Sequence, residues 1–226
     1  MGDRNASRVR LFETSAIVSN GLLSAILLGS GLDDVTEMAW IPIGAMVALG
    51  WLVADLASGV VHWLADTWGS ERIPIMGPVF VKSFREHHIH PEAITRHDWV
   101  ETNGANAGTM VPALLALAVL SLVYPGSVGA AWIVAAISLN FWTVIGNQIH
   151  KWAHMESPPR WVRWGQRCRI FIPPEAHRRH HNGTHDDHFC ITSGILNGLL
   201  GRLGVFRHLE KTVTFVTGYQ PRSQGF

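Results

Sequence analysis

Four stretches of the chain are apolar enough to cross a lipid bilayer, and polar segments separate them. They cover residues 15–31, 39–64, 109–124 and 128–149. A helix needs about 20 residues to span the hydrocarbon core, with a range of about 17–25. The first and third stretches are therefore short, whereas the second and fourth are ample. The pattern predicts an all-α integral membrane four-helix bundle, with residues 1–226 forming a single domain.

The basic residues lie on one side of the predicted bundle. Three of the 18 Lys and Arg precede residue 15, four lie within 65–108 and eleven follow residue 149. The short connections at 31–38 and 125–127 contain none. By the positive-inside rule, the N-terminus, the central loop and the C-terminal tail are all expected to be cytoplasmic. The membrane is then a bacterial inner membrane or the endoplasmic reticulum.

The first apolar stretch has an alternative interpretation as a cleaved signal peptide. Arg4, Arg8 and Arg10 precede it, as basic residues precede a signal core. Its end, however, leads into acidic residues and lacks a clear small-residue cleavage motif. We therefore expect a retained span.

The amino-acid composition excludes several classes of function. Charged residues make up 15% of the chain, against about 25% in an average soluble domain. The net charge of +1 gives no basic footprint for a nucleic acid. Two cysteines, Cys168 and Cys190, exclude a disulfide framework and a multi-cysteine zinc module. The unusual count is 13 His.

Residues 161–172 mix tryptophan and other apolar residues with arginine. This predicts an amphipathic helix in the headgroup region of the membrane, with packing on the protein's own core as the alternative. Pro173 and Pro174 are expected to end this helix and begin the next.

A first group of candidate chemical residues lies at the end of the second apolar stretch. Asp55, His62 and Asp66 share one helical stripe, and His62 and Asp66 are four residues apart. These two can bind one metal ion from a single helix face. Asp55 is deeper, and we expect it to accept a hydrogen bond from a ligand histidine, with a helix-packing contact as the alternative.

Two further groups of histidines follow. Asn147, His150 and His154 share a face at the end of the fourth apolar stretch, where two histidines one turn apart suit shared coordination. The run HRRHH at residues 177–181 places three imidazoles within one turn, and we expect them to converge. The central loop adds two adjacent histidines. The full candidate ligand set is His62, Asp66, His87, His88, His150, His154, His177, His180, His181 and His185.

This many imidazoles suits two metal ions, because a catalytic zinc needs only three protein ligands. Imidazole binds zinc, copper, iron and nickel, whereas the scarcity of cysteine argues against soft-metal storage. A pair of irons would activate O2, and a single zinc would hydrolyse its substrate instead. We expect a cytoplasmic helical cap that carries a histidine-rich di-iron site.

At these residues the chain resembles the Kua-type lipid desaturases, the plasmanylethanolamine desaturase family with relatives among plastid fatty-acyl desaturases. The matching strings are DLASGVVHWLADTWG (55–69), FREHH (84–88), TRHD (95–98), ETNG (101–104), NQIHKWAH (147–154), PRW (159–161), HRRHH (177–181) and FCIT (189–192). The resemblance covers roughly residues 50–222. His90 and His188 look peripheral to it and stay outside the ligand set. Together with Asp55 and Asn147, His97 completes the candidate catalytic residues.

The resemblance implies removal of two hydrogens from a lipid chain by two iron ions and O2. In the named family, the 1-O-alkyl chain of an ether phospholipid becomes the 1'-alkenyl chain of a plasmalogen. A fatty-acyl-lipid desaturase or a hydroxylase with the same di-iron chemistry is the alternative. Non-enzymatic transport of metal or haem is a distant alternative, because the histidines lie toward one surface and transporters bind near the bilayer midplane.

Electrons must come from another protein. The run of glycines at 198, 201 and 204 lacks the preceding strand that a dinucleotide site needs. We expect a small redox donor, a b-type cytochrome or a ferredoxin. Its docking site is expected at Arg160, Arg163, Arg167 and Arg169, with lipid headgroups as the alternative partner of these arginines.

Overall fold

The computed structural model describes residues 2–72, 81–182 and 185–222, with side chains from residue 6 onward. These residues form helices and no β-strand, which confirms the all-α class. The chain divides into two compact units. Unit 1 comprises Met1–Ala54 and His97–Gln148, and unit 2 comprises Asp55–Arg96 and Ile149–Phe226. The single-domain organisation stays a prediction.

Four helices are long and apolar enough to cross a membrane, as predicted. They are Ala6–Ser30 within α1 (Gly2–Ser30), α3 (Trp40–Thr67), α5 (Trp99–Val123), and Ala130–His154, which joins α6 (Ala130–Val144) to α7 (Gly146–His154). The predicted bounds of the first and third spans were too short. Polar residues occupy the added turns, so hydropathy alone missed them.

Helix α5 begins ten residues before the predicted span because Asp98 caps it. The carboxylate of Asp98 accepts hydrogen bonds from the amides of Val100 (2.9 Å) and Glu101 (3.0 Å). A side-chain oxygen at this position satisfies amides that lack a partner inside the helix. The guanidinium of Arg10 also binds this carboxylate at 2.7 Å, and it lowers the pKa of Asp98 to about 2.

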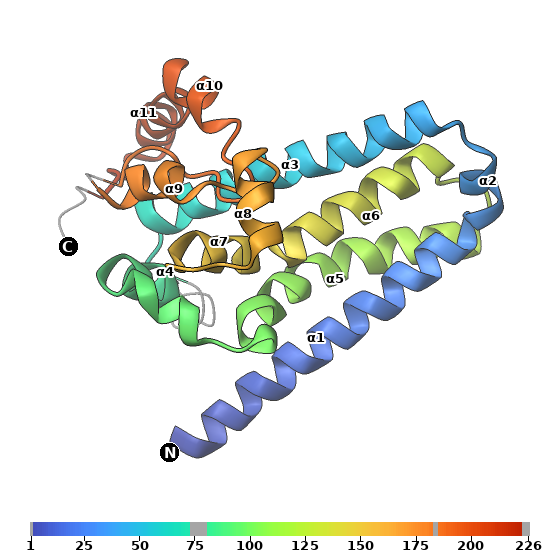
Figure 1. Cartoon of the computed structure of the whole chain (residues 1–226), viewed down its shortest axis with the longest axis horizontal. Helices are drawn as coiled ribbons and strands as arrows, with labels where there is room; N and C mark the ends of the chain where they lie inside the picture. The colour runs from blue at the N-terminus through green and yellow to red at the C-terminus, as the bar shows by residue number, and fades with distance from the viewer. Residues whose placement is uncertain (1, 73–80, 183–184, 223–226) are drawn as a thin grey trace. The chain divides into compact units, whose positions relative to one another are not determined.

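In unit 1, α1 and α5 lie side by side over much of their length (Figure 1). Small residues on α5 permit this approach: a side chain at Gly104 would overlap Glu13, and one at Gly108 would press on Phe12. Buried Leu27, Leu114 and Ile133 form the apolar core of this unit. The close helix packing through small residues is typical of membrane bundles.

A reciprocal amide pair joins α1 to α6 inside unit 1. The side chain of Asn20 donates to Asn140 at 2.8 Å, and Asn140 donates back to Asn20 at 2.9 Å. Asn20 also donates to the carbonyl of Ala107 on α5 at 3.2 Å. Both asparagines are buried, so the side-chain oxygen of each needs the donor that the other supplies.

The connections in unit 1 are tight. The short helix α2 (Leu32–Glu37) links α1 to α3. A turn at 124–127 joins α5 to α6, with a bond from the amide of Ser127 to the carbonyl of Tyr124 at 3.0 Å. Gly126 in this turn has φ of 77°, which a residue with a side chain rarely adopts, and Pro125 precedes it.

Unit 2 contains the second half of α3 and seven shorter helices among its described residues. These are α4 (Lys82–Ile89), η2 (Pro91–Arg96), the end of α7, α8 (Arg160–Arg167), α9 (Pro174–His181), α10 (Asn197–Arg202) and α11 (Val205–Thr217). Trp63, Phe189 and Phe206 form its apolar core. At Gly59, α3 lies so close to Cys190 that any side chain would collide with its sulfur.

The helix predicted over 161–172 is shorter in the structure. It ends at Arg167, because Arg169 turns left-handed with φ of 55° and the amides of Ile170 and Phe171 bond back to the carbonyl of Gly165. The next helix begins at Pro174, as predicted.

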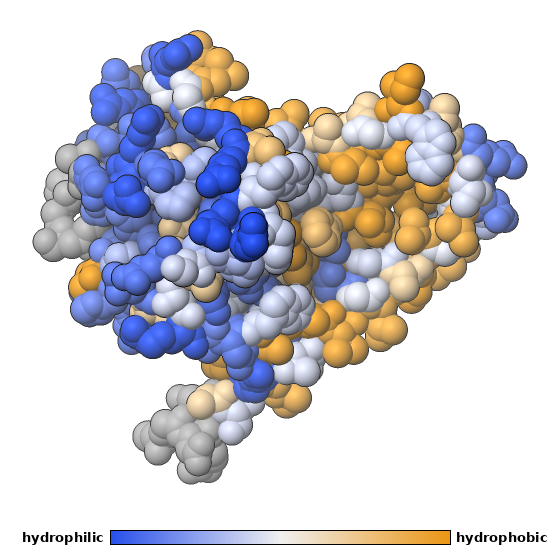
Figure 2. All heavy atoms as spheres, in the orientation of Figure 1, coloured by the Kyte–Doolittle hydropathy of each residue, from blue (hydrophilic) through white to orange (hydrophobic). Residues whose placement is uncertain are grey.

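The surface of the long helices is apolar. Figure 2 shows hydrophobic residues gathered over them on the face in view. The exposed large side chains of unit 1 include Leu115, Leu122, Trp132 and Phe141. A contiguous apolar surface of this kind is rare on soluble proteins, and it supports a membrane protein.

We expect loss of the asparagine pair to destabilise unit 1. Asn20→Ala removes both bonds of the pair and leaves the side-chain oxygen of Asn140 without its donor, and hydrogen bonds between membrane helices contribute about 0.5–2 kcal/mol. The thermal unfolding midpoint in detergent should fall, while Val18→Ala, at an exposed position of the same helix, should leave it unchanged. If the double variant with Asn140→Ala costs as much as the two single changes together, the pair is not coupled.

Candidate metal centre

Five histidines from three helices of unit 2 form the first group of candidate ligands. Helix α4 supplies His87, α7 supplies His150 and His154, and α9 supplies His177 and His181. One ring nitrogen of each lies within 4.8 Å of the others. The Nε2 atoms of His150 and His177 are 2.7 Å apart, those of His154 and His177 2.8 Å, those of His177 and His181 3.0 Å, and those of His150 and His154 3.2 Å.

Hydrogen bonds cannot account for these contacts. Each Nε2 carries either one proton or one lone pair, and three of them, from His150, His154 and His177, lie within 3.2 Å of one another. Three mutual contacts exceed what single protons and lone pairs can satisfy. Nitrogen ligands at right angles, each about 2.1 Å from a common ion, lie about 3.0 Å apart. A shared cation therefore fits the arrangement.

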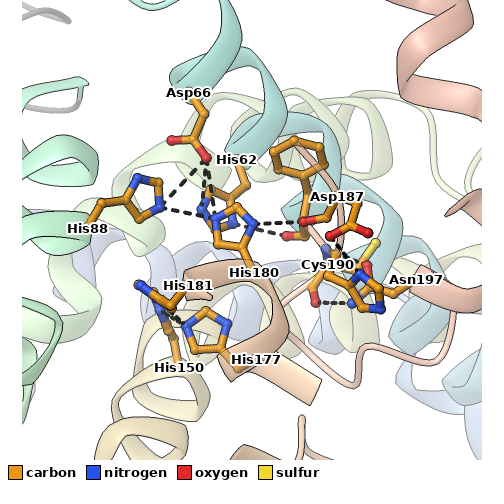
Figure 3. Close-up of polar contacts among 12 residues, drawn as sticks. His62, Asp66, His88, His150, His177, His180, His181, Asp187, Cys190 and Asn197 are labelled. Carbon is orange, nitrogen blue, oxygen red and sulfur yellow. Dashed lines mark hydrogen bonds and ion pairs between the residues drawn. The ribbon is translucent and has the colours of Figure 1, made fainter. Parts of the chain in front are cut away.

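A second group combines three histidines with one carboxylate. Its members are His62 and Asp66 on α3, His88 on α4 and His180 on α9. One oxygen of Asp66, Oδ2, lies 3.3 Å from Nε2 of His62, 3.5 Å from that of His180 and 3.8 Å from that of His88. Figure 3 shows these rings turned toward the carboxylate. Mixed imidazole and carboxylate ligands suit a transition-metal ion.

Backbone carbonyls fix the orientation of two rings in this second group. Nδ1 of His62 donates to the carbonyl of Phe189 at 3.1 Å, and Nδ1 of His180 donates to the carbonyl of Asp187 at 2.8 Å. A carbonyl can only accept, so Nδ1 of each ring carries the proton. The lone pair of each ring is then on Nε2, the atom that faces the group, as is usual for metal-binding histidines.

Burial favours the neutral form of His87, His88, His177 and His181. It is the main cause that lowers the pKa of His87 and His88 to about 2 and that of His181 to about 3, and neighbouring imidazoles lower these values further. The pKa of His177 falls well below its usual value for the same reasons. Neutral imidazole is the form that binds a metal.

Some buried polar atoms of the two groups lack a hydrogen-bond partner within the described part of the chain, as atoms that bind a metal would. Nε2 of His87 and Oδ1 of Asp66 are buried and make no hydrogen bond with any described residue. Buried polar atoms in native proteins normally have a partner, and both of these belong to the two groups. The donor chemistry and the geometry both fit one cation in each group.

The structure brings together nine of the ten predicted ligand residues, but it divides them differently from the expectation. The three imidazoles of the HRRHH run do not converge, because His177 and His181 join the first group while His180 joins the second. His87 and His88, adjacent in sequence, are divided in the same way. Consecutive residues on a helix point about 100° apart, so they face different groups.

His185 lies outside both groups, although its ring centroid is 4.5 Å from that of His88. His97 and Asn147 belong to unit 1. Nε2 of His97 is 3.5 Å from a carboxylate oxygen of Glu101, and Asn147 donates to Asn106 at 3.4 Å. The catalytic roles of His97 and Asn147 stay predictions.

Asp55 binds backbone amides rather than a histidine. Its Oδ1 accepts from the amides of Ser193 (2.7 Å) and Gly194 (3.0 Å), and its Oδ2 accepts from Leu196 at 3.3 Å. The expected imidazole partner is therefore replaced by the segment that follows Phe189. Because the carbonyl of Phe189 orients His62, Asp55 acts on the second group only through this segment.

Sequence reasoning missed the two carbonyls that orient the rings. Phe189 and Asp187 contribute main-chain oxygens, which every residue has, so no residue type signals the role. The segment is fixed further by Asn197, which accepts from the amide of Cys190 and donates to its carbonyl, both at 2.9 Å.

Comparison with known proteins agrees with this geometry. The family model of the lipid desaturase domain matches residues 51–224. The chain belongs to the lipid desaturase family. This confirms the resemblance stated from the sequence motifs.

Three curated proteins illustrate which desaturases this chain is similar to in sequence. It is 41% identical over 217 residues to plasmanylethanolamine desaturase of Myxococcus xanthus, covering 95% of this chain and 75% of that one. It is 43% identical over 187 residues to plasmanylethanolamine desaturase 1 of Mus musculus, covering 78% and 67%. It is 31% identical over 177 residues to the chloroplastic fatty acid desaturase 4 of Arabidopsis thaliana, covering 77% and 52%. No solved structure matches.

The protein is thus an oxidoreductase that desaturates a lipid in a membrane. Both histidine groups lie in residues that the family model matches. The two groups can bind metal, and they are the candidate site of the reaction.

We expect Asp55→Asn to destabilise unit 2 rather than to remove a ligand. The variant replaces one acceptor oxygen with an NH2 group that faces amide donors, and a hydrogen bond to a charged group contributes about 1.5–3 kcal/mol. The thermal unfolding midpoint should fall, while Asp34→Asn, at an exposed position of α2, should not change it. An unchanged midpoint for Asp55→Asn would show that the three amides do not depend on its charge.

Removal of a ligand from the first group should lower the metal content. His181→Ala deletes an imidazole whose Nε2 faces that of His177 at 3.0 Å, and the ring is only half-buried, so the fold should tolerate the loss. Elemental analysis of the purified protein should show less bound metal. His90→Ala is the matched control, because His90 is exposed and lies outside both groups. Equal metal in both variants would exclude His181 as a ligand.

Proposed function

We propose that the protein is a di-iron, O2-dependent desaturase that forms the 1'-alkenyl bond of plasmalogens from 1-O-alkyl ether phospholipids. The observation that carries the proposal is the presence of two adjoining ligand groups built almost entirely from neutral imidazole. Two of the named relatives support the ether-lipid substrate, since both are plasmanylethanolamine desaturases.

The reaction needs an oxidant and an electron source. Two hydrogens leave adjacent carbons of the alkyl chain, and O2, with two electrons and two protons from outside, becomes two molecules of water. Iron supplies the O2 activation that amino-acid side chains cannot perform. The electrons come from a small redox protein, a b-type cytochrome or a ferredoxin.

The chain's own residues hold and shield the centre. One ion would be held by His87, His150, His154, His177 and His181, and the other by His62, Asp66, His88 and His180. The carbonyls of Phe189 and Asp187 keep the rings of His62 and His180 in the tautomer that presents Nε2. His62, His177 and His180 are buried, so the two groups are shielded from bulk water at these rings.

The charge distribution supports a cytoplasmic location for both termini and for the metal centre. The short connections of unit 1 at 31–38 and 125–127 carry no Lys or Arg, while all the basic residues lie in the segments that we place in the cytoplasm. The reacting carbons of an ether lipid lie beside the glycerol, close to the headgroups. A centre at the cytoplasmic edge of the membrane is therefore well placed to reach them.

A fatty-acyl-lipid desaturase with the same di-iron chemistry is the second candidate. The identity of 31% to a chloroplastic fatty acid desaturase favours it over other reactions. The two candidates differ in the bond that is formed, a vinyl ether next to the glycerol or a double bond within an acyl chain.

Expression in a host that makes ether lipids but no plasmalogens tests the proposal. Lipid mass spectrometry should show an acid-labile species two mass units lighter than the plasmanyl lipid, and His181→Ala should abolish it while His90→Ala retains it. The matched variants separate the enzyme's own product from a product of the host.

Several results would contradict the proposal. A new double bond inside an acyl chain would favour the second candidate, and a hydroxylated lipid would indicate a hydroxylase. Metal analysis that finds one zinc per chain and no iron would exclude the di-iron chemistry.

A further inference from the structure

A charged cavity of about 690 Å³ lies beside the first histidine group, within unit 2. Its walls come from η2, the end of α7, α8 and the start of α9, and His154 forms part of them. The cavity thus reaches one of the candidate ligands directly. Its volume falls in the range of sites for small molecules, about 300–1,000 Å³.

The lining of the cavity carries both signs of charge. Four arginines are among the lining residues: Arg163, Arg167, Arg169 and Arg178. Three glutamates are also among them: Glu92, Glu156 and Glu175. Guanidinium groups recognise phosphate through paired charge-assisted hydrogen bonds, and carboxylates accept from an ammonium group. A ligand that carries both a phosphate and an ammonium matches this lining.

The backbone conformation of Arg169 is a second observation at this cavity, separate from the charges of its lining. Arg169 follows the end of α8 with φ of 55°, in the left-handed conformation that terminates many helices. Glycine occupies this position most often because any side chain raises the energy there. Because Arg169 is a lining residue and keeps this conformation at some cost, we take its side chain as the first candidate for contact with a ligand.

The outer face of α8 suits the headgroup level of a membrane. Trp161 and Trp164 are 57% and 61% exposed, whereas Val162 is fully buried. Tryptophan is enriched where membrane and water meet. Helix α8 therefore combines an interfacial aromatic face with arginines that line the cavity.

We propose that this cavity binds the phosphoethanolamine headgroup of the lipid substrate, with the arginines on the phosphate and the glutamates on the ammonium. The inference rests on the proposed function and adds a site that selects the headgroup. In an ether phospholipid only the glycerol separates the phosphate from the alkyl chain that reacts. A headgroup in a cavity walled by His154 would hold that chain next to the histidine groups.

A binding measurement on the purified, metal-loaded chain tests the inference separately from the reaction. Calorimetry in detergent micelles should show that a 1-O-alkyl lysophosphatidylethanolamine binds more tightly than the 1-O-alkylglycerol of the same chain length. Arg169→Gly should weaken binding of the phospholipid about tenfold, the effect of losing one charge-assisted hydrogen bond. Binding of the alkylglycerol should stay unchanged.

Thermal unfolding separates a binding role of Arg169 from a structural one. Glycine relieves the left-handed backbone, so Arg169→Gly should unfold at the same temperature as the unaltered protein or higher. Arg160→Gln is the matched control, because Arg160 begins the same helix but does not line the cavity. Equal weakening by both variants would indicate general attraction to anionic surfaces and would overturn the proposal.

Two further binding measurements show whether the cavity recognises the ammonium group and the lipid chain of the ligand. Glu175→Gln should weaken binding of the lysophosphatidylethanolamine but not of the corresponding alkyl lysophosphatidic acid, which has no ammonium. Free phosphoethanolamine should bind more weakly than the lipid, and equal affinity would assign the cavity to a soluble compound instead.

The remaining outcomes distinguish this inference from the proposed function. Full lipid affinity in Arg169→Gly would overturn the headgroup site, even if the vinyl ether forms normally. Headgroup-dependent binding without any vinyl ether product would support the site and contradict the proposed reaction.

Discussion

The crowding of imidazole nitrogens in a buried space is the constraint on which the centre depends. Nε2 atoms 2.7–3.2 Å apart, each with one proton or one lone pair, cannot satisfy all of their mutual contacts by hydrogen bonds. A cation that accepts the lone pair of each Nε2 satisfies these nitrogens at once. Metal binding should therefore stabilise unit 2 as well as supply its chemistry, since the free energy of binding adds to that of folding.

Helix α3 both carries candidate ligands and fixes the segment that orients one of them. Helix α3 supplies His62 and Asp66 one turn apart, and deeper on the same helix Asp55 binds the amides of the segment after Phe189. Gly59, between them, lets Cys190 pack directly against the helix backbone. One helix thus carries two ligands and anchors the segment whose carbonyl orients one of them.

The candidate metal centre and the charged cavity also share a residue. Helix α7 ends at His154, a candidate ligand that also forms a wall of the charged cavity. Helix α8 buries Val162 and exposes two tryptophans, while Arg163 and Arg167 line the cavity. A substrate that is apolar along its chain and zwitterionic at its head matches an apolar membrane surface and a cavity of mixed charge.

The sequence by itself determined the features that depend on short stretches of chain. Four apolar stretches predicted the four long helices, since spanning length and hydropathy are local properties. The spacing of four residues paired His62 with Asp66 and His150 with His154, because such residues share a helix face. The tryptophan-rich and arginine-rich pattern around residue 164 also predicted an amphipathic helix, although its end was placed too late.

Tertiary structure decided how these pairs combine. Only the packing of α4 against α7 and α9 shows that His87 joins one group and His88 the other, and that His180 leaves its neighbours in the HRRHH run. Asp55 was expected to face an imidazole but binds amides some 140 residues away in the chain, and the ring-orienting carbonyls of Asp187 and Phe189 have no residue signature. Contacts of this kind depend on which distant segments meet in space, and a helical period or a hydropathy pattern contains no information about that.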